Sequence, residues 1–234
     1  MNSPKIMLLA AVSTIAHAQV AGRSVAIPYT ATHEELWVGP HGEDKGHATH
    51  TFARKADATT LVIDGKISVL RYAAEDRTVE FTHEDNKIFT MGTGAVRTVT
   101  ENEDCVHVPV DAERIGEDTL LGHPAAHIRI NGGAQVTIDR WHAKDLACLE
   151  LQTVYTSNDG SRDIQKFTAL TIGEPDEKLF QLPSNPVEVT PREFFKSSSH
   201  MKGNTPGDAA DIENDASLDR LEEHYRKDKA LRGE

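Results

Sequence analysis

The sequence predicts a mainly β protein organised around an antiparallel sheet. Val136 and Ile138 alternate with polar neighbours, and so do Leu149 and Leu151, which is the period of half-buried strands. The sequence Asn-Asp-Gly at 158–160 turns the chain tightly between two such strands. The first half of the chain shows no helical periodicity. These observations favour consecutive strands that pair as neighbours.

The first 18 residues have the features of a secretory signal peptide. Lys5 is followed by the apolar run 6–12, and Ala16-His17-Ala18 is a small-residue cleavage site. The apolar run is too short to span a bilayer, which takes about 20 residues. No cysteine follows the site for a lipid anchor. We therefore expect cleavage after Ala18 and a soluble, periplasmic or secreted protein without a transmembrane segment.

The mature chain is strongly acidic. Residues 1–18 contain one basic and no acidic residue, so the remaining 216 residues carry 24 basic and 37 acidic side chains, a net charge of −13 with histidine neutral. Such a surface repels nucleic acid and anionic headgroups, which argues against a nucleic-acid partner. The length fits one β domain with a tail, residues 19–195 being the domain.

Between residues 26 and 99 the chain reads as a series of strands and turns. The sequence Asp64-Gly65 between apolar runs predicts a hairpin with a type I′ turn. The other expected strands are Tyr29–Val38, which Gly39-Pro40 stops, His47–Arg54, a segment around Val79 and Phe81, and Ile88–Met91 after a turn at 84–86.

The segment 116–183 continues the strands and closes with a helical turn. A strand from Gly116 to Ile130 is broken at Gly122, and Asn-Gly-Gly at 131–133 turns the chain into the strand at Val136. A further strand runs from about Ile164 to Ile172. In the sequence GEPDEKLF that follows Ile172, a proline at the first helical position and two acidic residues favour a short helical turn whose Leu-Phe pair faces the core.

This order of features resembles the exported LolA/LolB-like superfamily of lipoprotein carriers. The shared features are a glycine after an apolar pair, a strand, Trp141 opening a connector, a short return strand, and a last strand ending in GEPD-x-x-LF-x-x-P. The resemblance covers Tyr29 to Phe194, with specific motifs from Gly116 to Pro183. It implies a curved antiparallel sheet, a half-open barrel, whose concave apolar face is covered by helical pieces and binds or senses acyl chains of lipoproteins.

The chain departs from the carriers in two ways. The segment 19–28 is too short and too weakly periodic for the amphipathic helix that precedes their first strand. No ligand-contact motif of the carriers can be placed on this chain residue by residue. The resemblance therefore implies a fold and a general cavity but assigns no site residues.

Cys105 and Cys148 are the only cysteines, and in an exported protein this favours a disulfide. Closing a loop of this length would stabilise the fold by roughly 4 kcal/mol in the chain-entropy model. Two separate buried thiols are an alternative. A redox or metal-binding pair is a weaker one, because the C-x-x-C spacing is absent.

The tail differs in composition. Residues 196–215 have no aromatic and few apolar side chains, which predicts a disordered linker. Residues 216–234 form a helix with Leu218, Leu221 and Tyr225 on one face. This helix is either solvated, loosely docked on the domain, or a partner-binding element.

Known catalytic and metal-binding patterns fail here. His47 and His50 would point to opposite faces of a strand, and His123 and His127 would lie too far apart on one face. The sequence HEELW from residue 33 lacks the second histidine of a zinc protease motif, the segment 92–97 lacks the third glycine of a dinucleotide loop, and no G-x-S-x-G occurs. Adjacent carboxylates such as Glu34 and Glu35 fit a solvated edge. We expect no enzyme activity, cofactor or metal.

Four aromatic residues are candidates for lining a cavity: Trp37, Phe52, Phe81 and Trp141. The alternative is that they form ordinary core. The sequence thus favours a non-catalytic exported protein that binds an apolar or acylated ligand in the concave face of its sheet. The competing hypothesis is an envelope module for protein–protein interaction or stress sensing, which uses sheet edges or the C-terminal helix.

Overall fold

The computed structural model describes residues 18–20, 23–25, 27–92, 112–132, 136–197 and 216–233. The signal-peptide residues before Ala18, Cys105 and the linker residues 198–215 lie outside these ranges, so the predictions made for them remain predictions. Within the described ranges, no helix combines the length and apolar character needed to cross a membrane.

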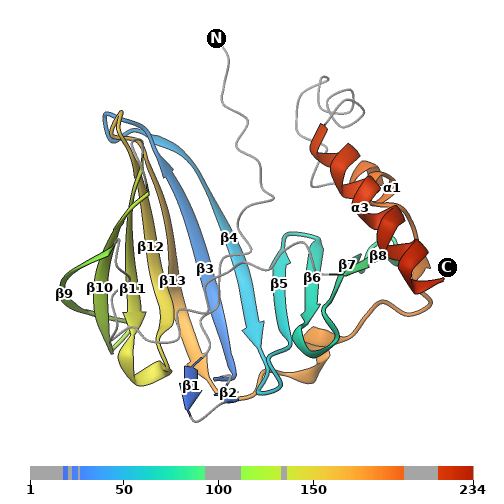
Figure 1. Cartoon of the computed structure of the whole chain (residues 1–234), viewed down its shortest axis with the longest axis horizontal. Coiled ribbons are helices and arrows are strands. Elements are labelled where there is room, and N and C mark those ends of the chain that lie inside the picture. The colour runs from blue at the N-terminus through green and yellow to red at the C-terminus, as the bar shows by residue number, and fades with distance from the viewer. Residues whose placement is uncertain are drawn as a thin grey trace.

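Twelve strands of the described chain form one curved, open sheet (Figure 1). Its order is β14-β8-β7-β6-β5-β4-β3-β13-β12-β11-β10-β9, antiparallel except that β14 pairs with β8 in parallel. The strands are β3 (Tyr29–Val38), β4 (Asp44–Arg54), β5 (Thr60–Asp64), β6 (Ile67–Tyr72), β7 (Arg77–Thr82), β8 (Lys87–Gly92), β9 (Ala112–Leu120), β10 (His123–Asn131), β11 (Val136–Ala143), β12 (Leu149–Ser157), β13 (Arg162–Ile172) and β14 (Val187–Glu188). The predicted mainly antiparallel β fold is confirmed.

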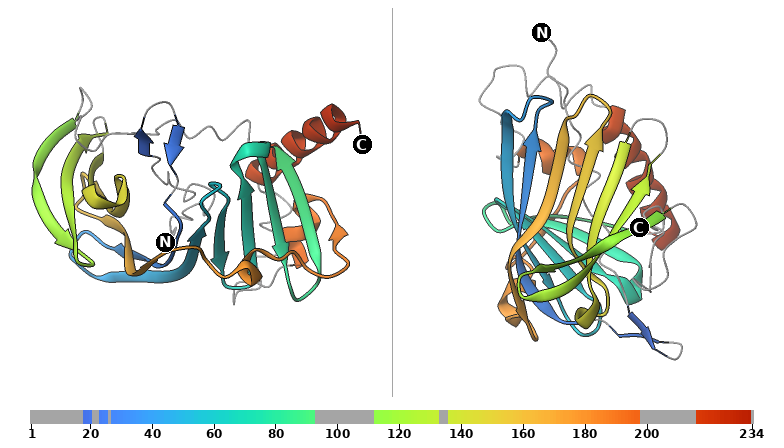
Figure 2. Two further views of the ribbon diagram at one scale, coloured as in Figure 1. Left: turned by 90° about the horizontal axis from the view of Figure 1, so that it is seen from below. Right: turned by 90° about the vertical axis from the view of Figure 1, so that its left-hand side faces the viewer.

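Short elements surround this sheet. A separate pair of strands, β1 (Ala18–Val20) and β2 (Arg23–Val25), precedes it. Three 3₁₀ turns, η2 (Ala73–Glu75), η3 (Lys144–Leu146) and η4 (Glu177–Phe180), and two helices, α1 (Pro191–Ser197) and α3 (Ala216–Arg232), complete the described chain. Figure 2 shows the connector between β11 and β12, with η3, on the inner side of the curve.

The turns follow the sequence closely, with one shift of register. At 158–160 the turn is as predicted: Gly160 has φ of +86° and its N–H donates to Ser157 O. In the β5–β6 hairpin, however, Asp64 still pairs with Ile67, so the loop is Gly65-Lys66. Only Gly65 has positive φ, 56°. The predicted type I′ turn at Asp64-Gly65 is therefore wrong, and the loop has the glycine-first pattern of type II′.

The segment from Gly116 to Ile130 is a hairpin, where a single interrupted strand was expected. Leu121 and Gly122 both have positive φ and reverse the chain between β9 and β10. The closing helical turn of the GEPDEKLF sequence is present as η4, with Asp176 as its N-cap, accepting a hydrogen bond from Lys178 N. Because Phe180 of η4 is buried, the turn packs on the sheet as predicted.

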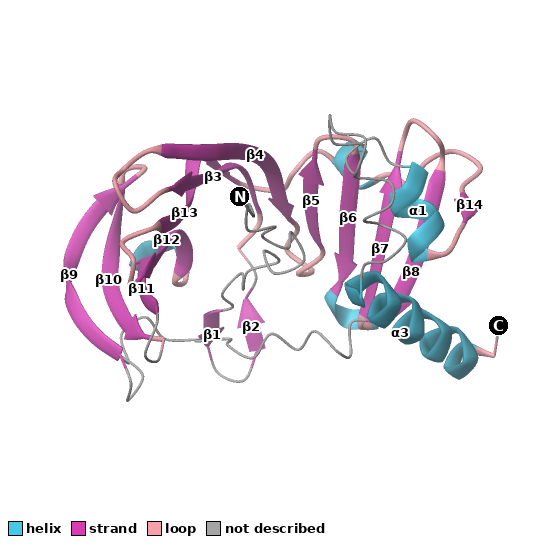
Figure 3. Ribbon diagram, turned by 90° about the horizontal axis from the view of Figure 1, so that it is seen from above, coloured by secondary structure: helices cyan, strands magenta, loops and turns pink. Residues whose placement is uncertain are grey.

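The register assigns side chains to the two faces of the sheet. Ala31, Phe52, Val62, Val69, Glu80 and Phe89 follow one another across β3 to β8 as directly opposite pairs. Directly opposite residues share a face, so these residues all lie on one side. Leu146 of η3 packs with Ala31 and Phe52, and η3 lies inside the curve, so this side is the concave face (Figure 3).

Both faces carry apolar clusters. On the concave face, the helix cluster of Ile67, Phe89, Phe194 and Tyr225 packs α1 and α3 against β6 and β8. On the opposite, convex face, η4 covers the convex cluster, which comprises Ala53, Leu61, Leu70, Val79, Phe81 and Phe180. Strands β5 to β8 are thus enclosed on both sides, which anchors one half of the sheet.

The C-terminal helix docks on the sheet through the predicted face. Leu218 and Tyr225 are buried, and Leu221 packs against the helix cluster. Tyr225 Oη donates to Glu188 Oε1 on β14, and Arg192 of α1 pairs with Asp219 of α3. Of the alternatives left open by the sequence, docking on the chain's own domain is the one observed.

Cys148 lies in the strained connector between η3 and β12. Both Ala147 and Cys148 have positive φ, 50° and 63°, and Cys148 N donates to Ala143 O. Cys148 is buried and is not a free thiol. Because Cys105 lies outside the described residues, the bridge between the two cysteines stays a prediction.

Candidate functional site

An apolar core cluster lies on the concave side of the sheet around β3, β4 and β12. Its buried members, the concave cluster, are Tyr29, Ala31, Phe52, Ala143, Leu146, Leu149 and Leu151. The half-buried ring of Phe167 on β13 has its centroid 5.8 Å from Tyr29 and 6.0 Å from Phe52. Tyr29 and Ala31 are two positions apart on β3, so the strand period presents both to this side. Its buried members are at most 8% exposed, so the cluster is an aromatic and aliphatic core on this side of the sheet.

Ionisable side chains continue the same face along β3 and β4. The ring of His33 is in contact with the apolar core cluster, 4.8 Å from Phe52 and 5.8 Å from Phe167 between centroids. Two residues further along β3, Glu35 is only 4% exposed. His50 of β4 pairs with His33 in the register. The concave face therefore changes from apolar to charged within one or two residues of His33.

His50 is the centre of this charged group, the His50 cluster, which comprises His33, Glu35, His50, Asp64 and Asp163. Its Nδ1 lies 3.3 Å from Asp64 Oδ1, and its Nε2 lies 3.7 Å from Glu35 Oε2. The two carboxylates, Asp64 first, raise the pKa of His50 to about 9, against the opposing effect of burial. His50 is therefore a cation at neutral pH, held between two anions.

In His33 and Asp163, burial favours the neutral form of the side chain. Burial, assisted by the nearby His50 cation, lowers the pKa of His33 to about 4, so His33 is neutral at pH 7. Burial and the charge of Glu35 raise the pKa of Asp163 to about 6. One face thus holds a cation, a neutral imidazole and a carboxyl group that is easily protonated.

Several buried polar atoms on this face have no hydrogen-bond partner among the residues that the structure describes. They include Tyr29 Oη, His33 Nδ1 and Asp163 Oδ1. Burial also raises the pKa of Tyr29 far above its usual range, so its phenol remains protonated. Buried polar groups are normally paired, and each of these atoms can donate to or accept from water or a ligand.

The structure divides the four sequence-predicted aromatic residues between the two faces. Trp37 and Phe52 lie on the concave face, Trp37 two positions beyond Glu35 and packed over Gly46. Phe81 adjoins Glu80 on β7 and belongs to the convex cluster. Arg140 lies on the concave face, because it is opposite Thr153, which is opposite Gln165, which in turn is opposite Glu35. Trp141 is the next residue on β11, so the Trp141 side chain lies on the convex face. The four therefore do not meet in one cavity.

Trp141 belongs to a polar network on β9 to β11. Its ring stacks on His127 with centroids 4.1 Å apart, and its Nε1 donates to Asp118 Oδ2. His127 Nε2 lies 2.8 Å from Asp139 Oδ1, which also accepts from Arg129. The network joins three neighbouring strands, so it stabilises the sheet at the β9 end.

His47 and His50 are arranged as the sequence predicts. His47 is opposite Leu36 and His50 is opposite His33, so the two point to different faces of β4. His123 and His127 contact different carboxylates, Asp145 and Asp139. Among the described residues, no group of three histidine, cysteine or acidic side chains is placed to hold a metal ion.

Glu35 is the site residue that the sequence-based interpretation missed. Because Glu34 and Glu35 are consecutive carboxylates, the sequence suggested a solvated edge. In the structure, Glu35 is buried beside His50, and Glu34 forms an ion pair with Lys166. A usable signal was present: Tyr29, Ala31, His33 and Glu35 occupy alternate positions of one strand. Once Tyr29 and Ala31 are assigned to the core, the strand period places the two polar residues on the same side.

No protein-family model and no curated protein sequence matches the chain. Solved structures do. An uncharacterised conserved protein from Thermus thermophilus is 12% identical, with a TM-score of 0.48 over 70% of this chain and 90% of that one. The MucA/MucB complex of Pseudomonas aeruginosa matches at 16% identity and a TM-score of 0.45 over 70% of this chain and 58% of the matched chain.

A LolA superfamily protein from Nitrosomonas europaea is 6% identical, with a TM-score of 0.34 over 66% of this chain and 90% of that one.

Proposed function

We propose that this protein is an exported, non-catalytic binding protein that holds an apolar or acylated ligand on the concave face of its sheet. The observation that carries the proposal is the junction at His33, whose ring touches Phe52 and Phe167 on one side and is adjacent to His50 on the other. An amphiphile needs an apolar surface for its chain and polar groups for its head. Both occur here on one face.

The physical chemistry of the two halves suits such a ligand. Each methylene group of an acyl chain removed from water contributes about 0.8 kcal/mol, so a chain of eight or more carbons is enough for measurable affinity. The unpartnered Tyr29 Oη and His33 Nδ1 can hydrogen-bond an ester or amide oxygen. Specific polar contacts of this kind orient a ligand that hydrophobic contact alone would not position.

The non-catalytic part of the proposal rests on the partners of the two histidines. His50 is paired with two carboxylates, which keep it protonated and unable to act as a base at neutral pH. Within the described ranges, neither His33 nor His50 has a serine, threonine or cysteine hydrogen-bond partner. An activated nucleophile requires such a pair.

The proposal is tested by native mass spectrometry of the mature protein purified from an exporting host, followed by solvent extraction and lipid analysis. We expect a stoichiometric adduct that carries an acyl chain. A bare protein mass that persists after incubation with medium-chain and long-chain lipids contradicts it.

A matched pair of variants on β13 locates the binding face. Phe167 lies on the concave face, and Ile164 lies on the convex face opposite Leu36, and both are half-buried. Phe167→Ala should weaken binding of a fluorescent fatty acid by about tenfold, which corresponds to about 1.4 kcal/mol. Ile164→Ala should leave it unchanged. Equal losses in both variants would indicate a general loss of stability.

Protein–protein interaction is the second candidate, and one observation favours it. Strand β9 ends the sheet and pairs with β10 alone among the described strands. Ile115 on this strand and Leu121 directly after it are 41% and 40% exposed. Such an edge can accept an added strand from a partner. A photo-cross-linking residue at position 115 should then yield an envelope-protein adduct in the exporting host. One at Ile172, 44% exposed elsewhere on the sheet, should not.

A further inference from the structure

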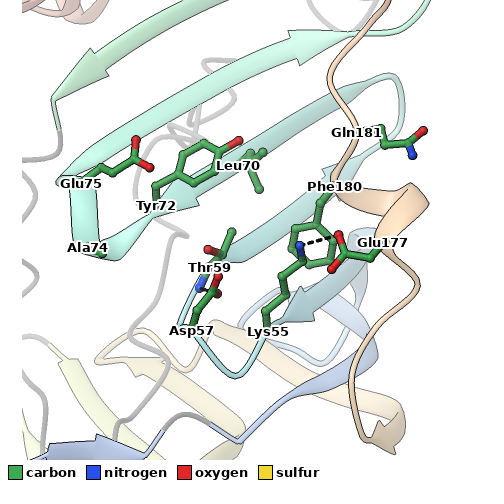
Figure 4. A pocket seen from close by; sticks show the side chains of 10 residues that line it. All are labelled: Lys55, Asp57, Thr59, Leu70, Tyr72, Ala74, Glu75, Glu177, Phe180 and Gln181. Atoms are coloured by element: carbon green, nitrogen blue, oxygen red, sulfur yellow. Dashed lines mark hydrogen bonds and ion pairs between the residues drawn. The ribbon is translucent and has the colours of Figure 1, made fainter.

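A pocket of about 340 Å³ lies on the side of the sheet opposite the proposed ligand-binding face (Figure 4). Three distant segments line it: the turn after β4, the end of β6 with η2, and η4. Its lining residues are Lys55, Asp57, Thr59, Leu70, Tyr72, Ala74, Glu75, Glu177, Phe180 and Gln181. Since Leu70 and Phe180 belong to the convex cluster, the floor is apolar and fixed by core packing.

The rim of this pocket is acidic. Asp57, Glu75 and Glu177 face a single basic lining residue, Lys55. Desolvation opposes ionisation of Asp57, but hydrogen bonds from Thr59 outweigh it and lower the pKa of Asp57, so this carboxylate is charged at neutral pH. The whole chain is acidic as well, with a net charge of −12, and attracts cations over a longer range.

The chain's own cations already show which groups these walls accept. Lys55 Nζ lies 4.5 Å from the ring centroid of Phe180 and 2.7 Å from Glu177 Oε2. At the other end of the pocket, the guanidinium carbon of Arg77 lies 4.2 Å from the Tyr72 centroid, and Arg77 Nη2 lies 2.8 Å from Glu75 Oε2. Each aromatic ring of the pocket is therefore combined with a carboxylate around a cation.

These two pairings leave the pocket with a surplus of negative charge. Lys55 balances Glu177 and Arg77 balances Glu75, whereas Asp57 has no salt bridge to another residue in the described part of the chain. Glu177 and Glu75 are 77% and 57% exposed in their side chains, so a cation from solution can compete for them. An aromatic ring beside carboxylates attracts ammonium and guanidinium groups more than neutral ones.

We propose that this pocket is a second binding site, which takes an organic cation: the ammonium group of a lysine side chain or of a free amine, held by Asp57 and competing with Lys55 and Arg77 for the rings of Phe180 and Tyr72. The site is independent of the concave face. Because exposed ion pairs and cation–π contacts each contribute little, the affinity is weak, with a dissociation constant near the millimolar range.

The test is amide chemical-shift mapping of the isotopically labelled mature protein with three probes. These are N-acetyl-lysine amide, butylammonium, and N-acetyl-norleucine amide as the neutral control. We expect the lysine probe to shift the amide signals of Thr59, Ala74 and Gln181 and the norleucine probe to leave them unchanged. Shifts from butylammonium as well mean that a free amine is sufficient; shifts from the lysine probe alone assign the site to a peptide.

A matched pair of carboxylates supplies the control. Asp57 and Asp159 are both exposed turn residues whose Oδ1 accepts the N–H of the residue two positions on. Asp57→Asn keeps the turn and should weaken binding three- to tenfold, and Asp159→Asn should not change it. Glu177→Gln, at the exposed rim, should also weaken binding, so the test does not depend on one variant.

Three outcomes overturn the proposal. One is equal shifts with the norleucine probe. Another is shifts scattered over the acidic surface, with none concentrated at the pocket. The third is binding that neither Asp57→Asn nor Glu177→Gln reduces. Loss of lipid binding at the concave face has no bearing on these results.

Discussion

His50 Nδ1 lies 3.3 Å from Asp64 Oδ1, so an imidazolium on β4 is paired with a carboxylate at the end of the neighbouring strand. Glu35, on the strand at the other side of β4, holds the second ring nitrogen. This arrangement ties three consecutive strands of the concave face together through one titratable group.

The pairing predicts a fall in stability at alkaline pH. Because the pKa of His50 rises from 6.5 to about 9 on folding, its contribution is complete below pH 6.5 and is lost as the pH rises through 9. The free energy of unfolding, measured with urea, should fall by about 2 kcal/mol between pH 7 and pH 9.5. In His50→Gln the fall should disappear. His47→Gln, on the other face of β4, should retain it.

Asp163 predicts a stabilising substitution. Burial and the charge of Glu35 raise its pKa to about 6, so ionising it is unfavourable in the folded state. The cost is absent below the unfolded pKa of 3.8 and complete above pH 6. Asp163→Asn should stabilise the protein by about 1 kcal/mol at pH 7.5, after allowance for its partial exposure, and have no effect at about pH 3.5.

Asp159→Asn is the control of opposite sign for this prediction. Hydrogen bonds from Ser161 lower the pKa of Asp159, so its neutralisation should lower stability at pH 7.5. If both substitutions changed the urea midpoint in the same direction, net charge and not local environment would be the cause.

Tyr225 predicts how strongly α3 is attached. Its ring is buried 6.5 Å from Phe89, and its hydroxyl donates to Glu188. Tyr225→Ala should lower the free energy of unfolding by about 3 kcal/mol through the cavity and the lost hydrogen bond. Lys227→Ala, exposed on the same helix, should change it by less than about 0.5 kcal/mol. Faster tryptic release of the helix in Tyr225→Ala alone would mean that α3 detaches before the sheet unfolds.

The predicted bridge between Cys105 and Cys148 is checked by thiol titration. The denatured, unreduced mature protein should show no reactive thiol, and reduction should lower stability by roughly 4 kcal/mol. Two titratable thiols before reduction would contradict the bridge. Cys148→Ser should then mimic the reduced protein, because either change opens the same loop.

The strands were predictable because most of them end at strong turn sequences. The alternation at Val136 and Leu149 and the turns at 158–160 and 84–86 correspond to observed elements. The II′ loop at Gly65-Lys66 was missed because Asp64-Gly65 is itself a favoured two-residue turn. The predicted loop therefore started one residue before the observed one. Local sequence indicates that the chain reverses but does not determine which residue pairs last.

The face to which each side chain points was harder to predict. Period-two alternation separates two faces, but β5 to β8 are covered on both sides, so both faces of these strands are apolar. Phe81 packs in the convex cluster, whereas Val69 packs against the helix cluster on the concave face. Which side becomes concave depends on the curvature of the whole sheet, a long-range property. For the same reason the burial of Glu35, and the pocket built from three segments far apart in sequence, are visible only in three dimensions.

The pairing of β14 with β8 gives the two ends of the sheet different capacities for self-association. At the β14 end the outer strand is two residues long, and Glu188 is bound by Tyr225 and Lys229 of α3, so little backbone is free to extend the sheet. At the other end β9 offers nine residues. Among the described strands, β9 is therefore the edge that can extend the sheet, and pairing of two molecules through that one edge forms a closed two-fold pair and not an open fibre.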